Sequence, residues 1–163
     1  MDHGTMLEIR RDTLESEQTR ALLALHLQGM LGHSPREYVF ALDLSALKVP
    51  EITVWSAWEG DRIAGIGALK ALDDRAGEIK SMRTHPDFLR RGVAARLLDR
   101  IIAEARQRGM QQLSLETGSG PAFEPALALY RRRSFVEGEA FGAYVPNPFS
   151  QYLHLSLTGG ELH

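Results

Sequence analysis

Residues 78–108 constrain the fold of this 163-residue chain more than any other stretch. Polar and apolar side chains alternate over residues 78–84, which predicts a strand that buries one face. A short basic segment, residues 85–92, follows this strand. From Val93 onward apolar residues recur at helical spacing, and Gly109 is a typical residue to end the helix. We therefore expect a strand, a cation-rich turn and a long helix in immediate succession.

This arrangement predicts an anion site at the start of the helix. The first N–H groups of a helix have no partner within it, and its dipole is positive at that end, so a phosphate binds there readily. Gly92 and Ala94 are small enough to let a phosphate approach the backbone. No Gly-Lys-Ser/Thr follows, which excludes a P-loop, and the single glycine does not fit the dinucleotide-binding fingerprint.

Composition excludes several classes of protein. A hydrophobic content of 44% suits one domain with a real core, which we place at residues 6–158 between flexible ends at 1–5 and 159–163. The net charge of −2 gives no electrostatic footprint for nucleic acid. The absence of cysteine excludes disulfides and a cysteine acyl-enzyme. Without an apolar membrane span, a signal peptide or a histidine pair at ligand spacing, we expect a cytoplasmic protein with no metal.

The remaining pattern predicts a mixed order of strands and helices. Residues 59–62, Glu-Gly-Asp-Arg, mark a tight hairpin between two of the strands. A second turn is expected at 71–77. The other predicted strands lie at 7–10, 52–58, 63–69, 113–116, from 135 and at 152–157, and the other helices at 13–31, 37–44 and 125–132.

Two motifs in this order resemble the GNAT superfamily of N-acetyltransferases. Residues 89–94 match its pyrophosphate loop, roughly Gln/Arg-x-x-Gly-x-Gly/Ala, except that Leu89 stands at the first position. Residues 129–135 match its Leu-Tyr-x-x-x-Gly-Phe signature, with Ser134 in place of glycine. The resemblance is to a bacterial subgroup of uncharacterised acetyltransferases. It implies an α/β, single-domain acyl-CoA N-acyltransferase fold, with a mixed sheet of six to seven strands and about four helices.

The resemblance also implies acetyl-CoA as co-substrate. In the family the strand before the loop separates from its neighbour, and its backbone amides bind pantetheine and the acetyl oxygen. The loop binds the pyrophosphate. An asparagine that often contacts pantetheine is replaced here by Phe123. The implied cofactor-binding residues are Met82, Arg83, Thr84, Arg90, Arg91, Gly92, Val93, Ala94, Ala95, Phe123 and Tyr130.

Three residues are candidates for proton transfer. Tyr130 matches the family's general acid, and a phenol of pKa about 10 is suited to protonating a thiolate. Glu78 stands where the histone-acetylating branch has its base, and Glu116 is the rival; each could instead pair with Lys80 or a nearby arginine. An α-amine of pKa about 8 would need no strong base. Strand alternation places Glu78, Lys80, Met82 and Thr84 on one face, and Ile79, Ser81 and Arg83 on the other.

The acceptor pocket would be built by the first helices and residues 136–150, as in the family. Its polar candidates are His26, Ser34 and Tyr144, with Glu37, Tyr38 and Asn147 also in these segments. We expect direct acetyl transfer to a primary amine of a small molecule or amino acid. The alternatives are a protein N-terminal or lysine acetyltransferase and a non-catalytic acyl-CoA sensor. No nucleic-acid or membrane partner is expected, and a homodimer is one option for the assembly.

Overall fold

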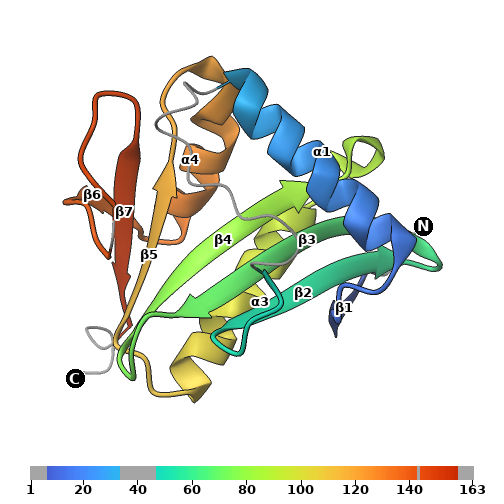
Figure 1. Cartoon of the computed structure of the whole chain (residues 1–163), viewed down its shortest axis with the longest axis horizontal. Coiled ribbons are helices and arrows are strands. Elements are labelled where there is room, and N and C mark those ends of the chain that lie inside the picture. Colours follow the sequence, from blue (N-terminus) through green and yellow to red (C-terminus); the bar gives the residue numbers. More distant parts are fainter. Residues whose placement is uncertain (1–6, 34–46, 143, 158–163) are drawn as a thin grey trace.

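The computed structural model describes residues 7–33, 47–142 and 144–157, with side chains from 26 to 33 excepted. Seven strands, three α-helices and two 3-10 turns make up this part of the chain (Figure 1). In order they are β1 (Glu8–Arg11), α1 (Glu17–His33), β2 (Ile52–Glu59), β3 (Arg62–Ala71), β4 (Ala76–Thr84), η3 (Pro86–Phe88), α3 (Val93–Gln107), β5 (Gln112–Thr117), η4 (Pro121–Phe123), α4 (Glu124–Arg132), β6 (Val136–Gly138) and β7 (Gln151–Ser156).

All seven strands belong to one mixed sheet, in the order β1-β2-β3-β4-β5-β7-β6. Neighbouring strands are antiparallel except β4 and β5, which run parallel. A parallel pair needs a crossover connection, and α3 supplies it. The predicted α/β fold with a mixed sheet of six to seven strands is confirmed. The expected helix at 37–44 and the two chain ends lie outside the described residues.

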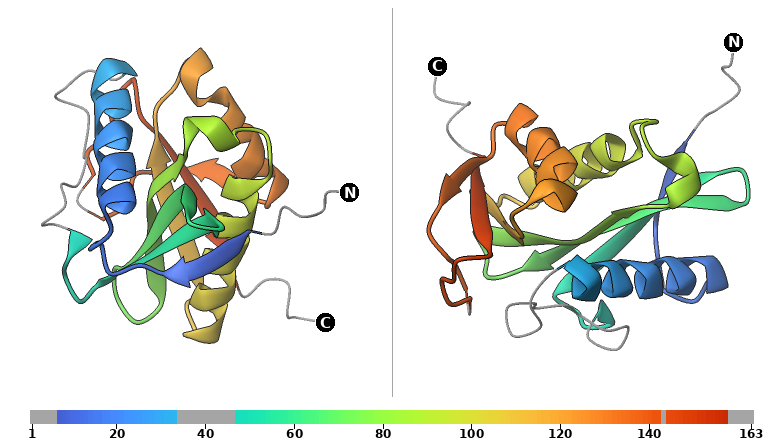
Figure 2. Two further views of the ribbon diagram at one scale, coloured as in Figure 1. Left: turned by 90° about the vertical axis from the view of Figure 1, so that its right-hand side faces the viewer. Right: turned by 90° about the horizontal axis from the view of Figure 1, so that it is seen from above.

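The helices cover the two faces of the sheet unequally. α1 lies on one face, while α3 and α4 lie together on the other (Figure 2). The main core forms between the sheet and the α3–α4 layer, and it contains Leu97, Ile101, Leu113, Leu127 and Leu153. Two smaller clusters lie on the other side of the sheet, one of them around Leu22 of α1. Within the described residues no helix is long and apolar enough to cross a membrane.

Local sequence signals explain where the long elements begin and end. α3 starts after Gly92 and is followed by Gly109, and both glycines have the positive φ that favours this residue (78° and 82°). α1 begins four residues later than the predicted 13, because Ser16 Oγ accepts hydrogen bonds from Gln18 N and Thr19 N. Such hydroxyl acceptors are common at helix starts.

Ser134 follows α4 at a position where the resemblance expects glycine. Its φ is 74°, and its N–H donates to Arg131 O at 3.0 Å. This is the left-handed residue that closes many helices, and a side chain there costs about 1 kcal/mol or more. Ser134 therefore adopts a left-handed backbone that would favour the glycine of the Leu-Tyr-x-x-x-Gly-Phe signature.

A β-bulge in β4 corrects the predicted face assignment of that strand. Lys80 pairs with Ala68 and Arg83 with Ile66, so Ser81 and Met82 together oppose Gly67. Ser81 adopts φ 58°, and such an extra residue breaks the alternation of side chains. The predicted grouping of Met82 with Lys80, and of Arg83 with Ile79, is therefore wrong.

The two faces of β4 follow from these contacts. Met82 packs into the α3 side of the sheet, where its Sδ would lie 2.5 Å from a Cβ added to Gly67. Arg83 instead shares a face with its partner Ile66, which packs against Leu22 of α1. Glu78, Lys80 and Arg83 thus line the α1 face of β4.

Candidate functional site

The N-terminus of α3 presents unpaired backbone N–H groups. The first helical bond runs from Arg96 N to Gly92 O, and no backbone acceptor in the described chain binds the amides of residues 93–95. Arg90 and Gly92 both have positive φ, 65° and 78°. A Cβ added to Gly92 would meet nothing within 4 Å. This is an open, positively polarised concavity of the kind that holds phosphate oxygens.

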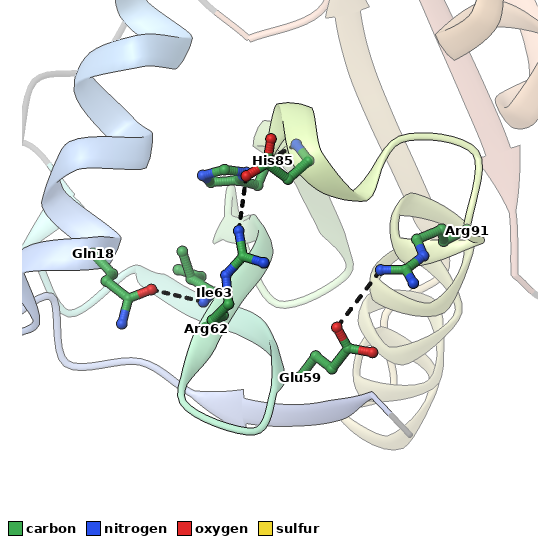
Figure 3. A network of polar contacts seen from close by, with 7 residues as sticks. Gln18, Glu59, Arg62, Ile63, His85 and Arg91 are labelled. Carbon is green, nitrogen blue, oxygen red and sulfur yellow. Dashed lines mark hydrogen bonds and ion pairs between the residues drawn. The ribbon is translucent and has the colours of Figure 1, made fainter. Parts of the chain in front are cut away.

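The loop before α3 is anchored by the hairpin of β2 and β3. Arg91 reaches back to Glu59 at 3.6 Å, while Arg62 pairs with Asp87 at 2.7 Å (Figure 3). Both arginines also lie over the ring of buried Phe88. Arg90 forms no ion pair or hydrogen bond with a described residue. Of the two predicted loop arginines, Arg91 is therefore engaged and Arg90 is available to a ligand.

Other predicted loop residues can contribute only backbone groups. Val93 is buried with its side chain against Gly65, and Ala94 and Ala95 pack on the main core. Their amides, in contrast, point out of the helix start. The structure thus brings together the predicted residues of the anion site, with Leu89 exposed beside them.

β4 and β5 pair over only three positions before they separate. The last pair is Glu78 with Ser114, whereas β4 continues to Thr84 and β5 to Thr117. Beyond Glu78, β4 therefore has no strand partner on its β5 side within the described chain. The diverging arrows are visible in Figure 1. The predicted separation of these strands is confirmed, and the backbone of Met82, Arg83 and Thr84 lies along it.

A trio of polar side chains, one buried and two half-buried, lies at this point on the α1 face. Glu78 is 3% exposed, and its Oε2 accepts hydrogen bonds from Tyr144 Oη at 2.5 Å and Lys80 Nζ at 3.0 Å. Lys80 also donates to Tyr144 Oη at 3.0 Å. Burial, with the adjacent Glu78 carboxylate, raises the pKa of Tyr144 far above its usual range, so this hydroxyl stays protonated. The alternative in which Glu78 pairs with Lys80 is the one the structure shows.

Glu116 faces the trio from β5 and has a different environment. Its Oε2 accepts a hydrogen bond from Ser150 Oγ at 2.5 Å, and it forms no ion pair within the described ranges. Burial raises the pKa of the Glu116 carboxyl above its ordinary value; Ser150 and Lys80 oppose this shift, while Glu78 adds to it. A carboxylate without a close cation and with a raised pKa is better suited to accept a proton than one held by two donors.

Residues 144–150 contact this polar cluster on the α1 side of the sheet, through Tyr144 and Ser150. Tyr144 packs on Tyr152, with ring centroids 5.7 Å apart, and Tyr152 donates its hydroxyl to Val145 O at 3.2 Å. Ser119 Oγ donates to Phe149 O at 2.6 Å, which fixes the end of the segment to the loop after β5. Polar residues far apart in sequence therefore meet around the separated strands.

Tyr130 lies on the opposite side, in the α3–α4 layer. It is buried and packs edge-on against Phe135 at 5.7 Å between ring centroids. Burial raises the pKa of its phenol to about 12. The hydroxyl has no hydrogen-bond partner among the residues described, so it is free to donate to a ligand.

The structure locates the other predicted residues as follows. Phe123 ends η4 and stacks edge-on with Phe149 at 5.6 Å. His26 belongs to α1, but its side chain is outside the described set, as are Ser34, Glu37 and Tyr38. Asn147 accepts from the amides of Phe149 and Ser150 and so shapes the segment 144–150. No group of three potential metal-binding side chains occurs in the described part of the chain.

Sequence reasoning missed two parts of this site. It placed Arg83 on the wrong face, and it gave Ser150 no role. The bulge has no clear local signal, since serine with positive φ is uncommon. The Asn147-Pro148 dipeptide is a recognisable turn signal. The hydrogen bond from Ser150, which follows this turn, to Glu116 of β5 is a tertiary contact, and no local pattern indicates it.

Comparison with known proteins agrees with this geometry. Residues 12–135 match the model of the Acetyltransferase (GNAT) family. The N-acetyltransferase YsnE of Bacillus subtilis (strain 168), itself uncharacterised, is 50% identical over 151 residues, covering 93% of this chain and 100% of that protein. YedL of Escherichia coli (strain K12), also an uncharacterised N-acetyltransferase, is 47% identical over 152 residues, covering 93% and 96%.

Solved structures share the fold. A Klebsiella pneumoniae protein assigned as an acyl-CoA N-acyltransferase has a TM-score of 0.78 and 27% identity, covering 93% of this chain and 98% of that one. A GNAT acetyltransferase from Elizabethkingia anophelis, solved with acetyl-CoA bound, has a TM-score of 0.68 and 18% identity, covering 93% and 98%. That protein of the same fold thus binds acetyl-CoA. The chain belongs to the GNAT family and is an acetyl-CoA-dependent N-acetyltransferase.

Proposed function

We propose that this enzyme transfers an acetyl group from acetyl-CoA directly to the primary amine of a small molecule or amino acid. The separation of β4 and β5 after Glu78 carries this proposal, because it exposes strand backbone between two chemically different sides. The start of α3 and Tyr130 lie on one side, and the cluster of Glu78, Lys80 and Glu116 lies on the other. A thioester bound along β4 from the side of α3 would face an amine that enters from the side of Glu116.

On the side of the sheet that carries α3, charge and hydrogen bonding determine which residues bind which part of acetyl-CoA. The amides of residues 93–95 and Arg90, which has no side-chain partner among the described residues, bind the pyrophosphate. The free amides of β4 beyond Glu78 bind pantetheine and stabilise the oxyanion that forms at the acetyl carbonyl. Phe123 replaces an amide side chain and contributes only an apolar wall.

The acceptor side supplies the base. We assign this role to Glu116, acting directly or through water, because Glu78 Oε2 is already held by Lys80 and Tyr144. Glu78 then orients Lys80 and Tyr144, and it is the alternative base if Tyr144 moves away.

The reaction balances without a protein-bound intermediate. Glu116 takes one proton from the substrate ammonium, and the neutral nitrogen attacks the thioester carbonyl. The C–N bond forms first and leaves an oxyanion on the acetyl oxygen, and the C–S bond then breaks as the carbonyl re-forms. The second proton from the nitrogen ends on the CoA sulfur, whose negative charge Tyr130 stabilises by donating a hydrogen bond.

A panel of acceptors tests the proposal. Purified chain, acetyl-CoA and single amines, amino acids or lysine-containing peptides would be assayed for release of free thiol. We expect amine-dependent turnover with small acceptors. Turnover with peptides alone would favour the protein-acetylating alternative, and thiol release that ignores the amine would contradict the proposal. A cytoplasmic location and a homodimer remain predictions.

A further inference from the structure

The bulge in β4 places Arg83, a cation without a partner among the described residues, on the acceptor side of the sheet. Arg83 pairs with Ile66, whose side chain packs against α1, so the guanidinium belongs to the same face as Lys80. Without the extra residue at Ser81 it would point to the α3 side. The bulge therefore moves one positive charge from the cofactor layer to the acceptor layer.

Arg83 has no ion pair or hydrogen bond within the described residues, although it is half-buried. The other cation on this face, Lys80, is already held by Glu78 and Tyr144. A half-buried guanidinium has five N–H donors, and here no described side chain accepts from them. A carboxylate can accept two of these hydrogen bonds at once, because its two oxygens match the planar fork. Among the described residues of this face, Arg83 is thus a cation that can bind an anion.

The charges on the face are arranged in a definite order. Glu78 and Lys80 form a closed pair where the strands last meet. Beyond it, β5 carries the carboxylate of Glu116, which accepts a hydrogen bond from Ser150 but forms no ion pair within the described residues, and β4 carries Arg83. The partners of Lys80 and Arg83 on β3 are two residues apart, which corresponds to about 7 Å along a strand. Within the described residues, a carboxylate without a cation partner and a guanidinium without an anion partner therefore lie on the two sides of the same opening.

We propose that the acceptor is an amino acid or a closely related amino carboxylate. Its carboxylate binds Arg83, and its ammonium group faces Glu116. This inference rests on the proposed function and narrows its substrate class. A molecule that carries an amine but no carboxylate would contact Glu116 and would offer no acceptor to Arg83.

The test compares amino acids with the amines that remain when their carboxylate is removed. Suitable pairs are phenylalanine with phenethylamine and histidine with histamine. In the unchanged chain, kcat/KM should be higher for the amino acid of a productive pair. Arg83→Gln should lower the ratio of kcat/KM, amino acid over amine, by about 10- to 150-fold, the range expected for a lost hydrogen bond to a charged group. Arg83→Lys should give an intermediate ratio, because it keeps the charge and loses the fork.

Arg75→Gln is the matched control, because Arg75 is an exposed arginine in the turn between β3 and β4. It should leave the ratio unchanged. Calorimetry with acetyl-CoA should show the same Kd for Arg83→Gln as for the unchanged chain.

Three outcomes would overturn the inference, and they differ in meaning. If amines without a carboxylate are the better acceptors, the substrate class is wrong and the proposed function stands. If Arg83→Gln weakens acetyl-CoA binding and slows both members of a pair equally, Arg83 is a cofactor ligand. If no acceptor of either kind supports turnover, the proposed function fails along with the inference.

Discussion

Replacing Tyr130 by phenylalanine tests how the enzyme handles the departing CoA sulfur. The phenol has a pKa of about 12, whereas a thiol such as cysteine has a pKa of about 8.5. Complete transfer of the phenolic proton would therefore be uphill by roughly 5 kcal/mol, at 1.36 kcal/mol per pKa unit. We infer that Tyr130 stabilises the thiolate chiefly by donating a hydrogen bond, and that the proton itself comes from the amine.

The size of the effect follows from this role. A hydrogen bond to a charged group contributes about 1.5–3 kcal/mol, so Tyr130→Phe should lower kcat by about 10- to 150-fold. The Kd of acetyl-CoA should change little, since the thioester carries no charge. The fold should persist, because phenylalanine keeps the packing against Phe135 and the lost hydroxyl leaves no described protein group unpaired.

Steady-state thiol release, calorimetry with acetyl-CoA and thermal unfolding would be measured on both proteins. Full kcat in the variant would refute the assignment and leave Tyr130 as a packing residue. A parallel loss of acetyl-CoA affinity would instead mean that the tyrosine acts in the ground state. With a pKa of about 12, ionisation of Tyr130 should not reduce kcat of the unchanged chain below about pH 11.

Two further predictions concern the acceptor side and the reaction path. Glu116 has a raised pKa in the folded chain, so it binds its proton more tightly there than in the unfolded chain; its contribution to stability is present at low pH and is lost as pH rises through the folded pKa. Glu116→Gln should therefore raise the melting temperature at pH 7–8 relative to the unchanged chain, with a smaller gain near pH 4, while lowering kcat; lower stability at pH 8 would contradict this account. Direct transfer predicts that initial-rate plots at several fixed amine concentrations intersect and that acetyl-CoA alone leaves no acetylated protein by mass spectrometry. Parallel lines, or an acetylated chain that passes its acetyl group to added amine, would show an acyl-enzyme.

Much of the fold could be predicted because its signals are local. Three features depend only on residues close together in the sequence: the apolar face of α3, the glycines at 92 and 109, and the hairpin at 59–62. Each therefore appears in the sequence as a period or a turn residue. The anion site follows from the same segment, since a helix start after a basic turn needs no distant partner.

The acceptor side was less predictable because its contacts join distant residues. Tyr144 and Glu78 are 66 positions apart, and Ser150 and Glu116 are 34 apart. No periodicity encodes such pairs. The bulge at Ser81 was missed for a related reason: its extra residue is placed by pairing with β3, and Met82 packs over Gly67 as a result. The single extra residue places Met82 on the α3 side of the sheet and Arg83 on the α1 side, the reverse of the predicted assignment.

Paired glycine variants test most directly whether acetyl-CoA binds at the start of α3. Gly92 and Gly109 flank the same helix, both with positive φ and open space around the position of a Cβ. Glutamate at either site therefore carries similar backbone strain, about 1–2 kcal/mol, but only Gly92→Glu puts bulk and negative charge where the pyrophosphate would bind.

Calorimetric titration of both folded variants with acetyl-CoA is the decisive measurement. We predict that Gly109→Glu retains the affinity of the unchanged chain and that Gly92→Glu loses detectable binding. Equal affinities in the two variants would show that the cofactor does not bind at this helix start.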